Sequence, residues 1–328
     1  MPFVIQTEYL LADVGGTQTR VAIGDMKTGP TCFRVFDNSE YPDIASLVFA
    51  YFSQIGLNHL PRIGVIAVAS PIQGDMVRMT NRNWKFSVQA MQKRLGLKLL
   101  HVLNDFTAVA YAVPYIRGKG RTRIGSSGVA QPGFPIGVLG PGTGLGVSAL
   151  IPAGNVWHTL ESEGGHVTLA TVTEEEARIV GRLRAWYGHV SAERVLSGPG
   201  LANLYRAIAD LEGLATDMIT PDEISRRALF GNDPLASRTL NIFFAMLGTV
   251  AGNLALTLGA RGGVYLAGGI LPNMMQAMKC SQFRERFTGK GRFCSYLKTI
   301  PTYLILDPYP ALRGLHGYLK HVMQMKKI

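Results

Sequence analysis

Two acidic segments of this chain have residue types and spacing that could support catalysis or ligand binding. The first is Asn104-Asp105, which follows the apolar run LLHVL and directly precedes a helical pattern. A carboxylate held at the end of a strand is well placed to act as a general base. Asn and Asp are also normal helix N-caps. Only one of the two residues needs to cap the helix, so both interpretations can hold together.

The second acidic segment is ESEGGH at 161–166, which places two acids, two glycines and a histidine within six residues. Carboxylate and imidazole groups brought together by a Gly-Gly bend can match the hydroxyl groups of a sugar. Zinc is disfavoured, because the segment has one histidine and no helical HExxH spacing. His166 alone would more often be structural. Glu193, just before a Gly-Pro-Gly turn, is either another ligand or a helix charge paired with Arg194.

Three glycine segments could approach a phosphate or a nucleotide, because backbone N–H groups can face an anion where no Cβ intervenes. They are Gly15-Gly16-Thr17, the loop GPGTGLG at 140–146, and Gly268-Gly269 after the predicted strand GGVYLA. None fits the dinucleotide fingerprint or the P-loop. Glycine is also usual in hairpin turns and tight βα turns, so this simpler interpretation stays open for each segment.

The elements that must position these residues alternate between short apolar strands and helical patterns, which predicts an α/β fold with a mixed or parallel sheet. Residues 117–135 are rich in Gly, Pro, Ser and Arg and indicate a linker or an exposed loop. The predicted strands are Leu10–Val14, Arg20–Gly24, Cys32–Phe36, Ile63–Ala69, Leu99–Leu103, Ile136–Leu139, Gly146–Ile151, Gly263–Ala267 and Tyr303–Leu306. The predicted helices are Ile44–Ile55, Val88–Leu95, Phe106–Ala112, Glu174–Tyr187, Pro199–Ala209, Pro221–Leu229, Pro234–Leu258 and Ala311–His321.

A weak internal repeat suggests two halves with related architecture. Residues 10–24 are LLADVGGTQTRVAIG and residues 138–151 are VLGPGTGLGVSALI. Each segment consists of a strand, a glycine-rich turn with a threonine, and a second strand. Two such hairpins facing each other could hold one ligand from both sides.

Composition limits the class of protein. The 328 residues include 47% hydrophobic and 17% charged side chains, which excludes a disordered chain, and the length predicts about two domains. Three scattered cysteines without CxxC or zinc spacing favour a reducing compartment, the cytosol. Residues 1–14 lack Lys and Arg, so a secretory leader is not expected.

Two features could mislead about partners. Ile242–Ala260 carries no charge over 19 residues, enough to cross a bilayer, but its polar residues and three glycines favour a buried core helix. The net charge is +11, concentrated at 117–123 and 279–298. We expect these runs to be solvated faces, because no nucleic-acid-binding module accompanies them. The sequence therefore predicts neither a membrane nor a nucleic-acid partner.

Taken in order, the segments resemble the bacterial-type glucokinases of the actin-like sugar-kinase superfamily. The resemblance implies an α/β, actin-like (ribonuclease H-like) two-domain fold with a ligand cleft between the domains. It implies a small domain at 1–114, completed by 303–328, and a large domain at 115–302. The segments that carry it are DVGGT at 13–17, MTNRNWKFS at 79–87, LNDFTAVA at 103–110, GPGTGLGV at 140–147, EGGHV at 163–167, SAERVLSGPGLANLYRAI at 191–208 and YLAGGI at 265–270.

The resemblance also implies a reaction and its residues. ATP, with Mg²⁺, would phosphorylate the 6-hydroxyl of glucose in a cytoplasmic enzyme that forms a homodimer. Asp105 would be the catalytic base and a glucose ligand, with Asn104, Glu163, His166 and Glu193 as further glucose ligands. Nucleotide contacts would come from Ala12, Asp13, Val14, Gly15, Gly16, Thr17, Gly142, Thr143, Gly144, Gly268 and Gly269, with Asp13 orienting the metal through water.

Departures from the family pattern are small. Ala12 stands where glycine often precedes the aspartate, Gln18 where asparagine is common, and Pro141 stiffens the second loop. Two alternatives stay open at this point: a kinase for another hexose or another phosphoryl donor, and a sugar-sensing regulator on the same fold. The regulator would need a DNA-binding module, and the first phosphate loop begins too early, at Asp13, to leave room for one upstream.

Overall fold

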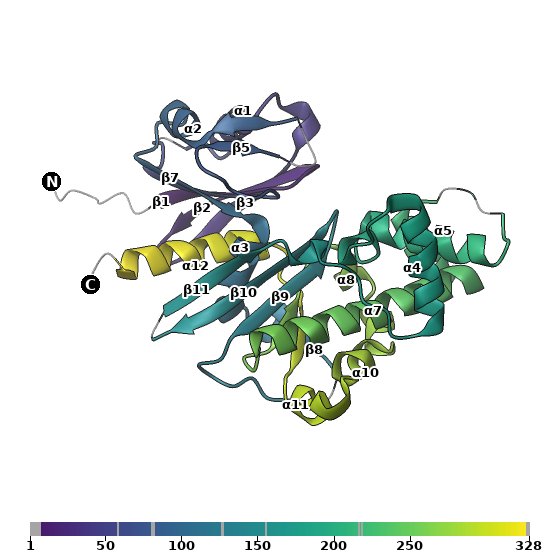
Figure 1. Ribbon diagram of the computed structural model, residues 1–328. Helices are drawn as coiled ribbons and strands as arrows, with labels where there is room; N and C mark the ends of the chain where they lie inside the picture. Colours follow the sequence, from purple (N-terminus) through teal and green to yellow (C-terminus); the bar gives the residue numbers. More distant parts are fainter. Residues whose placement is uncertain are drawn as a thin grey trace. The chain divides into compact units, whose positions relative to one another are not determined.

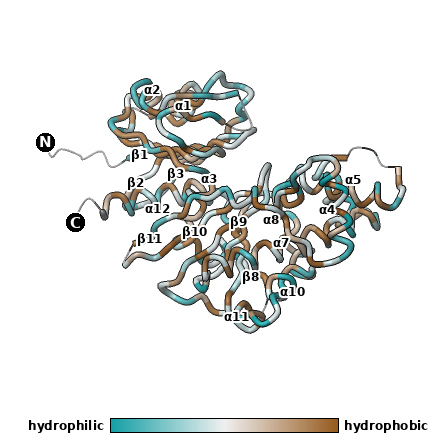
Figure 2. The backbone as a smooth tube through the Cα atoms, in the orientation of Figure 1, coloured by the Kyte–Doolittle hydropathy of each residue, from teal (hydrophilic) through white to brown (hydrophobic). Residues whose placement is uncertain are grey.

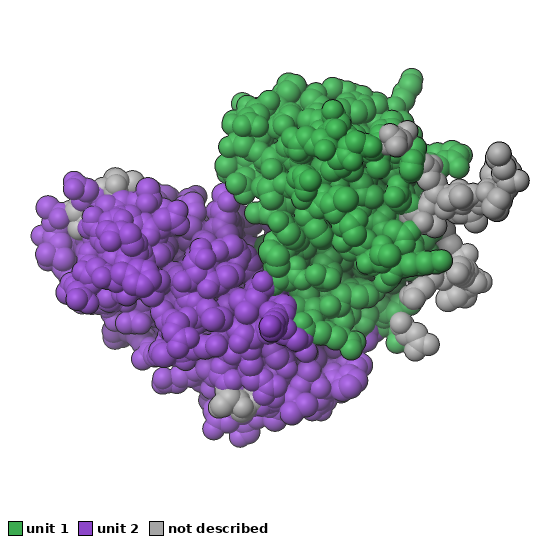
Figure 3. All heavy atoms as spheres, turned by 180° about the vertical axis from the view of Figure 1, so that it is seen from behind, with its two compact units in different colours: residues 1–117, 153–161, 307–328 green, residues 118–152, 162–306 purple. Residues whose placement is uncertain are grey.

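The chain divides into two compact units, each described here by itself (Figure 3). The first unit comprises 1–117, 153–161 and 307–328, and the second comprises 118–152 and 162–306. The predicted domain boundaries at 114/115 and 302/303 stay a prediction. The structure, a computed structural model, describes residues 8–57, 59–79, 83–125, 128–154, 156–215, 217 and 219–325. Residues 80–82 of the motif at 79–87 lie outside the described residues.

The first unit contains a five-stranded mixed sheet in the order β3-β2-β1-β4-β7 (Figure 1). Strands β1, β2 and β3 are antiparallel neighbours, whereas β1, β4 and β7 run parallel. Leu10, Leu11 and Ala12 of the central strand are completely buried, as expected for a strand covered on both faces. The bounds are β1 Glu8–Val14, β2 Gln18–Asp25, β3 Gly29–Asp37, β4 Ile63–Val68 and β7 Leu99–Asn104, with a separate hairpin of β5 Met76–Arg78 and β6 Lys85–Ser87.

In the first unit, helix α3 and the C-terminal helix α12 cross closely and lie side by side (Figure 1). Glycine makes this crossing possible: a Cβ on Gly314 of α12 would lie 1.7 Å from the carbonyl oxygen of Ala108 in α3. The C-terminal segment is therefore packed directly against the helix that begins at Asp105. The bounds are α1 Ile44–Gln54, α2 Val88–Arg94, α3 Asp105–Ala112 and α12 Pro310–Met325.

Helix α12 also carries a buried histidine whose titration should affect stability. His316 is 5% exposed and its Nδ1 is hydrogen-bonded to the hydroxyl of Tyr9. Burial, with smaller contributions from Lys320 and Arg313, lowers the pKa of His316 to about 4. An unfolded histidine takes up its proton near pH 6.5, so the unfolded chain binds more protons than the folded chain between these values.

We therefore expect the free energy of unfolding to fall as the pH is lowered from about 6.5 to about 4, by up to about 3 kcal/mol from this group. Urea unfolding of the wild type and of His316→Gln at pH 7 and pH 5 measures this contribution. Glutamine can keep a hydrogen bond to Tyr9 but does not titrate. If His316→Gln lost as much stability as the wild type between pH 7 and pH 5, the loss could not be assigned to His316.

The second unit contains helices that pack around strands β9, β12 and β13 of a six-stranded sheet in the order β11-β10-β9-β12-β13-β8. Strands β9, β12 and β13 run parallel, while β9 and β10 form an antiparallel hairpin, as β1 and β2 do. The two predicted hairpins of the internal repeat are thus confirmed. The bounds of the strands in this sheet are β8 Arg121–Ile124, β9 Ile136–Pro141, β10 Leu145–Ala153, β11 Val156–Ser162, β12 Val264–Leu266 and β13 Thr302–Ile305, and β11 up to Glu161 is counted in the first unit.

The long apolar helix α7 lies in the core of the second unit, and Figure 2 shows hydrophobic residues along its length. By length and composition it is the one helix among the described residues that would suit a membrane crossing, yet 67% of its most apolar window is buried. The expectation of a buried helix is confirmed. The helix bounds are α4 Glu174–Tyr187, α5 Gly198–Leu211, α6 Pro221–Phe230, α7 Pro234–Leu258, α8 Ile270–Asn273, α9 Met275–Lys279, α10 Phe283–Thr288 and α11 Cys294–Lys298.

The interpretation of 117–135 as a linker or exposed loop is wrong at β8. Strand β8 pairs antiparallel with β13, and its last residue, Ile124, is buried. The alternation in RTRI explains the strand, because Ile124 reaches the core while the guanidinium of Arg121 lies 4.5 Å from the centre of the Tyr303 ring. The arginines that made this segment resemble a loop are packed on tyrosines.

The interpretation of 279–298 as a solvated basic face is also wrong in part. Arg284 donates hydrogen bonds to the carbonyls of Leu297 (3.3 Å) and Ile300 (2.8 Å), and burial lowers its pKa to about 10. Lys290 donates to Asn253 Oδ1 at 2.6 Å. Because the apolar side of α10 is buried in the core, its neighbouring cations reach internal acceptors instead of solvent.

Candidate active site

The residues predicted in the first unit meet at one edge of its sheet. In the parallel strands β1, β4 and β7, Val14 is level with Val68, and Val68 is level with Asn104. The first glycine loop and Asn104-Asp105 therefore both begin at the carboxyl ends of parallel strands, two strand spacings or roughly 10 Å apart. This edge is where ligands of open α/β sheets bind.

Asn104 provides the helix cap at this edge, which settles one question that the sequence left open. Its Oδ1 accepts hydrogen bonds from the backbone N–H groups of Phe106 (2.9 Å) and Thr107 (3.2 Å). Asp105 is the first residue of α3, half-buried, and its Oδ1 accepts from the N–H of Phe106 at 2.8 Å. The Asp105 carboxylate thus stands at the start of a helix whose cap is supplied by its neighbour.

The first glycine loop is held by a side chain that the sequence analysis missed. Asn38, which is completely buried, donates from its side-chain amide to the carbonyl of Gly15 (2.9 Å) and from its backbone to the carbonyl of Thr17 (2.9 Å). Its Oδ1 accepts the hydroxyl of Thr19 at 2.7 Å. Asn38 lies beyond β3, so no short-range pattern in the sequence connects it to this loop.

Asp13 precedes the loop and faces Arg20, whose guanidinium lies 3.5 Å from its carboxylate. Burial raises the pKa of the Asp13 carboxyl, and the charge and hydrogen bond of Arg20 lower it, with a net shift upward. A Mg²⁺ ion that travels with ATP needs only one or two protein carboxylates, because water and phosphate supply its other ligands. A single sheltered carboxylate just before the first glycine loop fits that requirement.

In the second unit, the two remaining glycine segments lie against each other. A Cβ on Gly140 would be 2.2 Å from the carbonyl oxygen of Ala267, and a Cβ on Gly268 would be 2.2 Å from that of Pro141. Gly268 also has φ +93°, which favours glycine. By contrast, a Cβ on Gly269 would meet nothing within 4 Å in the part of the chain that the structure describes. Glycine at 140 and 268 is therefore required by close backbone contact, and the loop at 140–146 adjoins Gly268-Gly269.

The three predicted hexose ligands of the second unit also lie together. His166 Nε2 is 3.8 Å from Glu163 Oε2, and His166 Nδ1 is 3.9 Å from Glu193 Oε1. These separations are longer than hydrogen bonds, and the side chains of His166 and Glu163 are more than half exposed. Donors and acceptors so arranged can accept a polyhydroxylated ligand. Glu193 makes its close contact with Leu145, not with Arg194, whose guanidinium stacks over Tyr187.

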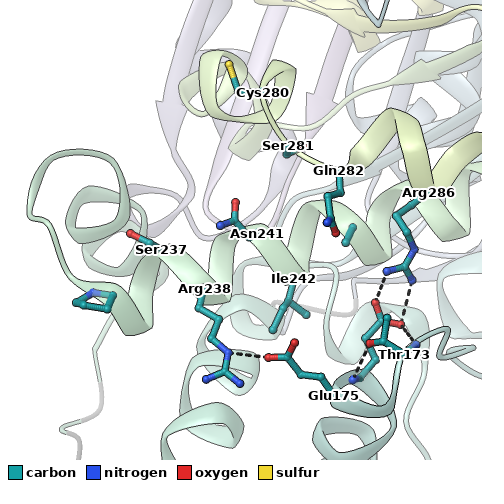
Figure 4. Close-up of a pocket in the computed structure, with 13 residues that line it drawn as sticks. Thr173, Glu175, Ser237, Arg238, Asn241, Ile242, Cys280, Ser281, Gln282 and Arg286 are labelled. Carbon is teal, nitrogen blue, oxygen red and sulfur yellow. Dashed lines mark hydrogen bonds and ion pairs between the residues drawn. The ribbon is translucent and has the colours of Figure 1, made fainter.

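A cavity of 580 Å³ in the second unit is separate from these residues, since none of the 13 residues lining it is a predicted site residue (Figure 4). Its charged lining residues are paired: Arg286 with Glu176 at 2.7 Å and Arg238 with Glu175 at 2.6 Å. Burial raises the pKa of Glu176, but hydrogen bonds from Arg286 and from backbone N–H groups outweigh it and lower the pKa overall. These contacts tie α4 to α10 and α7.

The fold is that of an α/β sugar kinase, as comparison with known proteins shows. The sequence model of the glucokinase family matches residues 10–322. A glucokinase from Paramagnetospirillum magneticum is 50% identical over 94% of this chain and 96% of its own length. The solved glucokinase from an Antarctic psychrotroph is 36% identical, with a TM-score of 0.85 over 96% of this chain and 99% of that one.

The chain belongs to the glucokinase family. A more distant solved structure, the ROK family glucokinase from Streptomyces griseus in complex with glucose and AMPPNP, has 18% identity and a TM-score of 0.65 over 95% of this chain and 98% of that one. At that identity the likeness extends to the fold alone.

Proposed function

We propose that this chain transfers the γ-phosphoryl group of ATP to the 6-hydroxyl of glucose, with Asp105 as the general base. The observation that carries the proposal is the register of β1, β4 and β7, which sets the first glycine loop and Asp105 at one edge of a sheet. Membership of the glucokinase family supports the reaction. The Streptomyces griseus protein, which shares the fold, was solved with glucose and AMPPNP, and these are the ligand types that we propose for this chain.

In this proposal Asp105 accepts the proton of the 6-hydroxyl as the oxygen attacks phosphorus. The transition state of phosphoryl transfer is loose, so most of the catalysis consists of positioning and electrostatic stabilisation. Asn104, Glu163, His166 and Glu193 orient the sugar through its hydroxyl groups. Asn104 uses Oδ1 for the helix cap, and its amide nitrogen donates one hydrogen to the carbonyl of Ser70 at 3.5 Å. The second hydrogen of that amide nitrogen is the one that we assign to the sugar.

The phosphates are assigned to the glycine loops Gly15–Thr17 and Gly142–Gly144, and the adenosine to Gly268-Gly269. The N–H groups of Gly15 and Gly142 donate to the carbonyls of Gln18 (3.0 Å) and Gly144 (2.8 Å) within these loops, so we assign the contacts with phosphate to the N–H groups that follow them, those of Gly16, Thr17, Thr143 and Gly144. Mg²⁺ would neutralise phosphate charge, and Asp13 would hold a water molecule of its hydration shell. A coupled assay of the purified chain across several hexoses and phosphoryl donors tests the reaction. We expect glucose with ATP to give the highest kcat/KM. A higher value with another hexose or donor would replace the proposed substrates.

Changes at Glu163 and His166 should affect the sugar more than the nucleotide. We expect Glu163→Gln and His166→Ala each to raise the KM for glucose by roughly tenfold and to leave the KM for ATP within about twofold, because each removes a partner of a sugar hydroxyl. Steady-state kinetics with each substrate varied in turn gives both constants. An equal rise in both would indicate a general structural defect, and stoichiometric zinc in the purified protein would indicate a metal site instead.

The homodimer, the cytoplasmic location and the absence of nucleic-acid and membrane partners stay predictions. Gel shift and sedimentation in solution would test the partners and the oligomeric state. Sequence-selective DNA retention at high salt would favour the regulator over the enzyme, because non-specific binding weakens steeply with salt.

A further inference from the structure

The second glycine loop is fixed at both ends by a single segment, 193–198, which leads into helix α5. The N–H of Gly198 donates to the carbonyl of Gly142 at 2.8 Å, and the N–H of Leu145 donates to Oε2 of Glu193 at 2.8 Å. Within the loop, the N–H of Gly142 donates to the carbonyl of Gly144 at 2.8 Å. The backbone that we assign to the phosphates is thus tied to Glu193 at one end and to α5 at the other.

Ser197 makes the holding segment rigid. Its hydroxyl donates to the carbonyl of Glu193 at 2.9 Å and accepts from the N–H of Gly200 at 2.9 Å. Ser197 is 2% exposed and is the N-cap of α5. The position of the Glu193 backbone is therefore set by the first turn of a 14-residue helix.

The glycine at 144 leaves space for the Glu193 carboxylate. A Cβ at this position would lie 2.5 Å from Glu193 Oε2 and 3.3 Å from its carboxyl carbon, with no other neighbour within 4 Å among the described residues. The φ of Gly144 is not in the left-handed region, so an alanine would fit the backbone conformation. An alanine would instead displace the carboxylate from the N–H of Leu145.

The same carboxylate faces the sugar ligands. Its other oxygen, Oε1, lies 3.9 Å from His166 Nδ1. The bend that carries His166 also adjoins the loop, since a Cβ on Gly165 would be 2.0 Å from the carbonyl oxygen of Leu145. Glu193 therefore reaches a phosphate-loop N–H with one oxygen and the predicted sugar ligands with the other.

We propose that Glu193 is a positioning residue for the second phosphate loop as well as a sugar ligand, and that it couples nucleotide binding to hexose binding. The inference rests on the proposed function, which assigns the loop to ATP. A carboxylate bonded to a loop N–H fixes the direction of the neighbouring N–H groups. Its loss leaves the loop with one fewer anchor before the nucleotide binds.

The test is a double-mutant cycle on Glu193→Ala and Gly144→Ala, with ADP binding measured by calorimetry in Mg²⁺ buffer without hexose. We expect each single variant to weaken ADP binding by roughly tenfold. We expect the double variant to bind ADP at most about twofold more weakly than either single variant, because both changes remove the same contact. Glu193→Gln, whose amide oxygen can still accept from Leu145, should keep more affinity for ADP than Glu193→Ala.

One control separates this effect from general damage. Thr220→Ala removes the N-cap of α6, as a matched loss of a helix cap in the same unit, and should leave ADP binding unchanged. Urea unfolding of every variant shows which of them are folded.

ADP affinity unchanged in both single variants, or effects that multiply in the double variant, would overturn the inference. The wild-type assay with glucose and ATP separates this outcome from failure of the proposed function. A wild type that phosphorylates glucose, with variants that bind ADP normally, overturns only the coupling role of Glu193. A wild type that binds ADP but phosphorylates another hexose overturns only the proposed sugar.

Discussion

Replacing Asp105 by alanine should lower kcat by at least about 100-fold while the protein stays folded, because general-base catalysis contributes roughly 10²–10⁴ in rate. The structure gives a reason for the fold to persist. The cap of α3 is supplied by Asn104, which accepts the N–H groups of Phe106 and Thr107. The coupled assay gives kcat, and urea unfolding gives the stability.

Two further variants make this result specific. Asp105→Asn keeps the size and an acceptor oxygen but cannot take the proton, so its kcat should fall as far as that of the alanine variant. Asn104→Ala should instead lower the free energy of unfolding by about 1 kcal/mol, because it removes the N-cap of α3. An Asp105→Ala enzyme that keeps more than about a tenth of the wild-type kcat would show that Asp105 is not the base.

The second large effect is expected on stability, at the crossing of α12 and α3. Gly314→Ala should lower the free energy of unfolding by about 3 kcal/mol or more, because the new methyl group would lie 1.7 Å from the carbonyl oxygen of Ala108 and the helices would have to separate. Urea unfolding measures the change. Because α3 begins at Asp105, we also expect kcat to fall in the folded fraction.

Gly181 provides the matched control, since it too lies within a helix, α4, but a Cβ there would meet no described residue within 4 Å. Gly181→Ala should raise the free energy of unfolding by roughly 0.5–1 kcal/mol, because alanine has the higher helix propensity. If Gly314→Ala were as stable as the wild type, the crossing of the two helices would not be as close as described.

Local features of the site could be predicted from the sequence because they depend on residues close together in the chain. The hairpins around the two glycine loops, the helix beginning at Asp105 and the bend at 163–166 each follow from a few neighbouring residues. Hydrophobic periodicity likewise predicted α7 as a buried helix, and its cap at Asp233 is again a local contact.

Cationic and loop-like segments were harder to interpret, since charge alone does not show which acceptors a side chain will meet. Arg286 pairs with Glu176, which precedes it by 110 residues, and Arg284 donates to carbonyls that end a neighbouring helix. Arg121 lies over Tyr303 of a strand that follows it by more than 100 residues. An exposed loop with the same residues would have the same composition, so composition alone cannot distinguish it from a packed segment.

The sequence by itself determined the two glycine hairpins, the acidic residues at the strand end and the bend, and the resemblance that joins them to a family. Only the tertiary structure decided which of these segments touch. The register of β1, β4 and β7 sets the first loop level with Asn104, Asn38 holds that loop from beyond β3, and Glu193 reaches the N–H of Leu145. The physical reason is that turns and caps form between neighbours in the chain, whereas these contacts join residues that only the packing of distant strands and helices brings within hydrogen-bond distance.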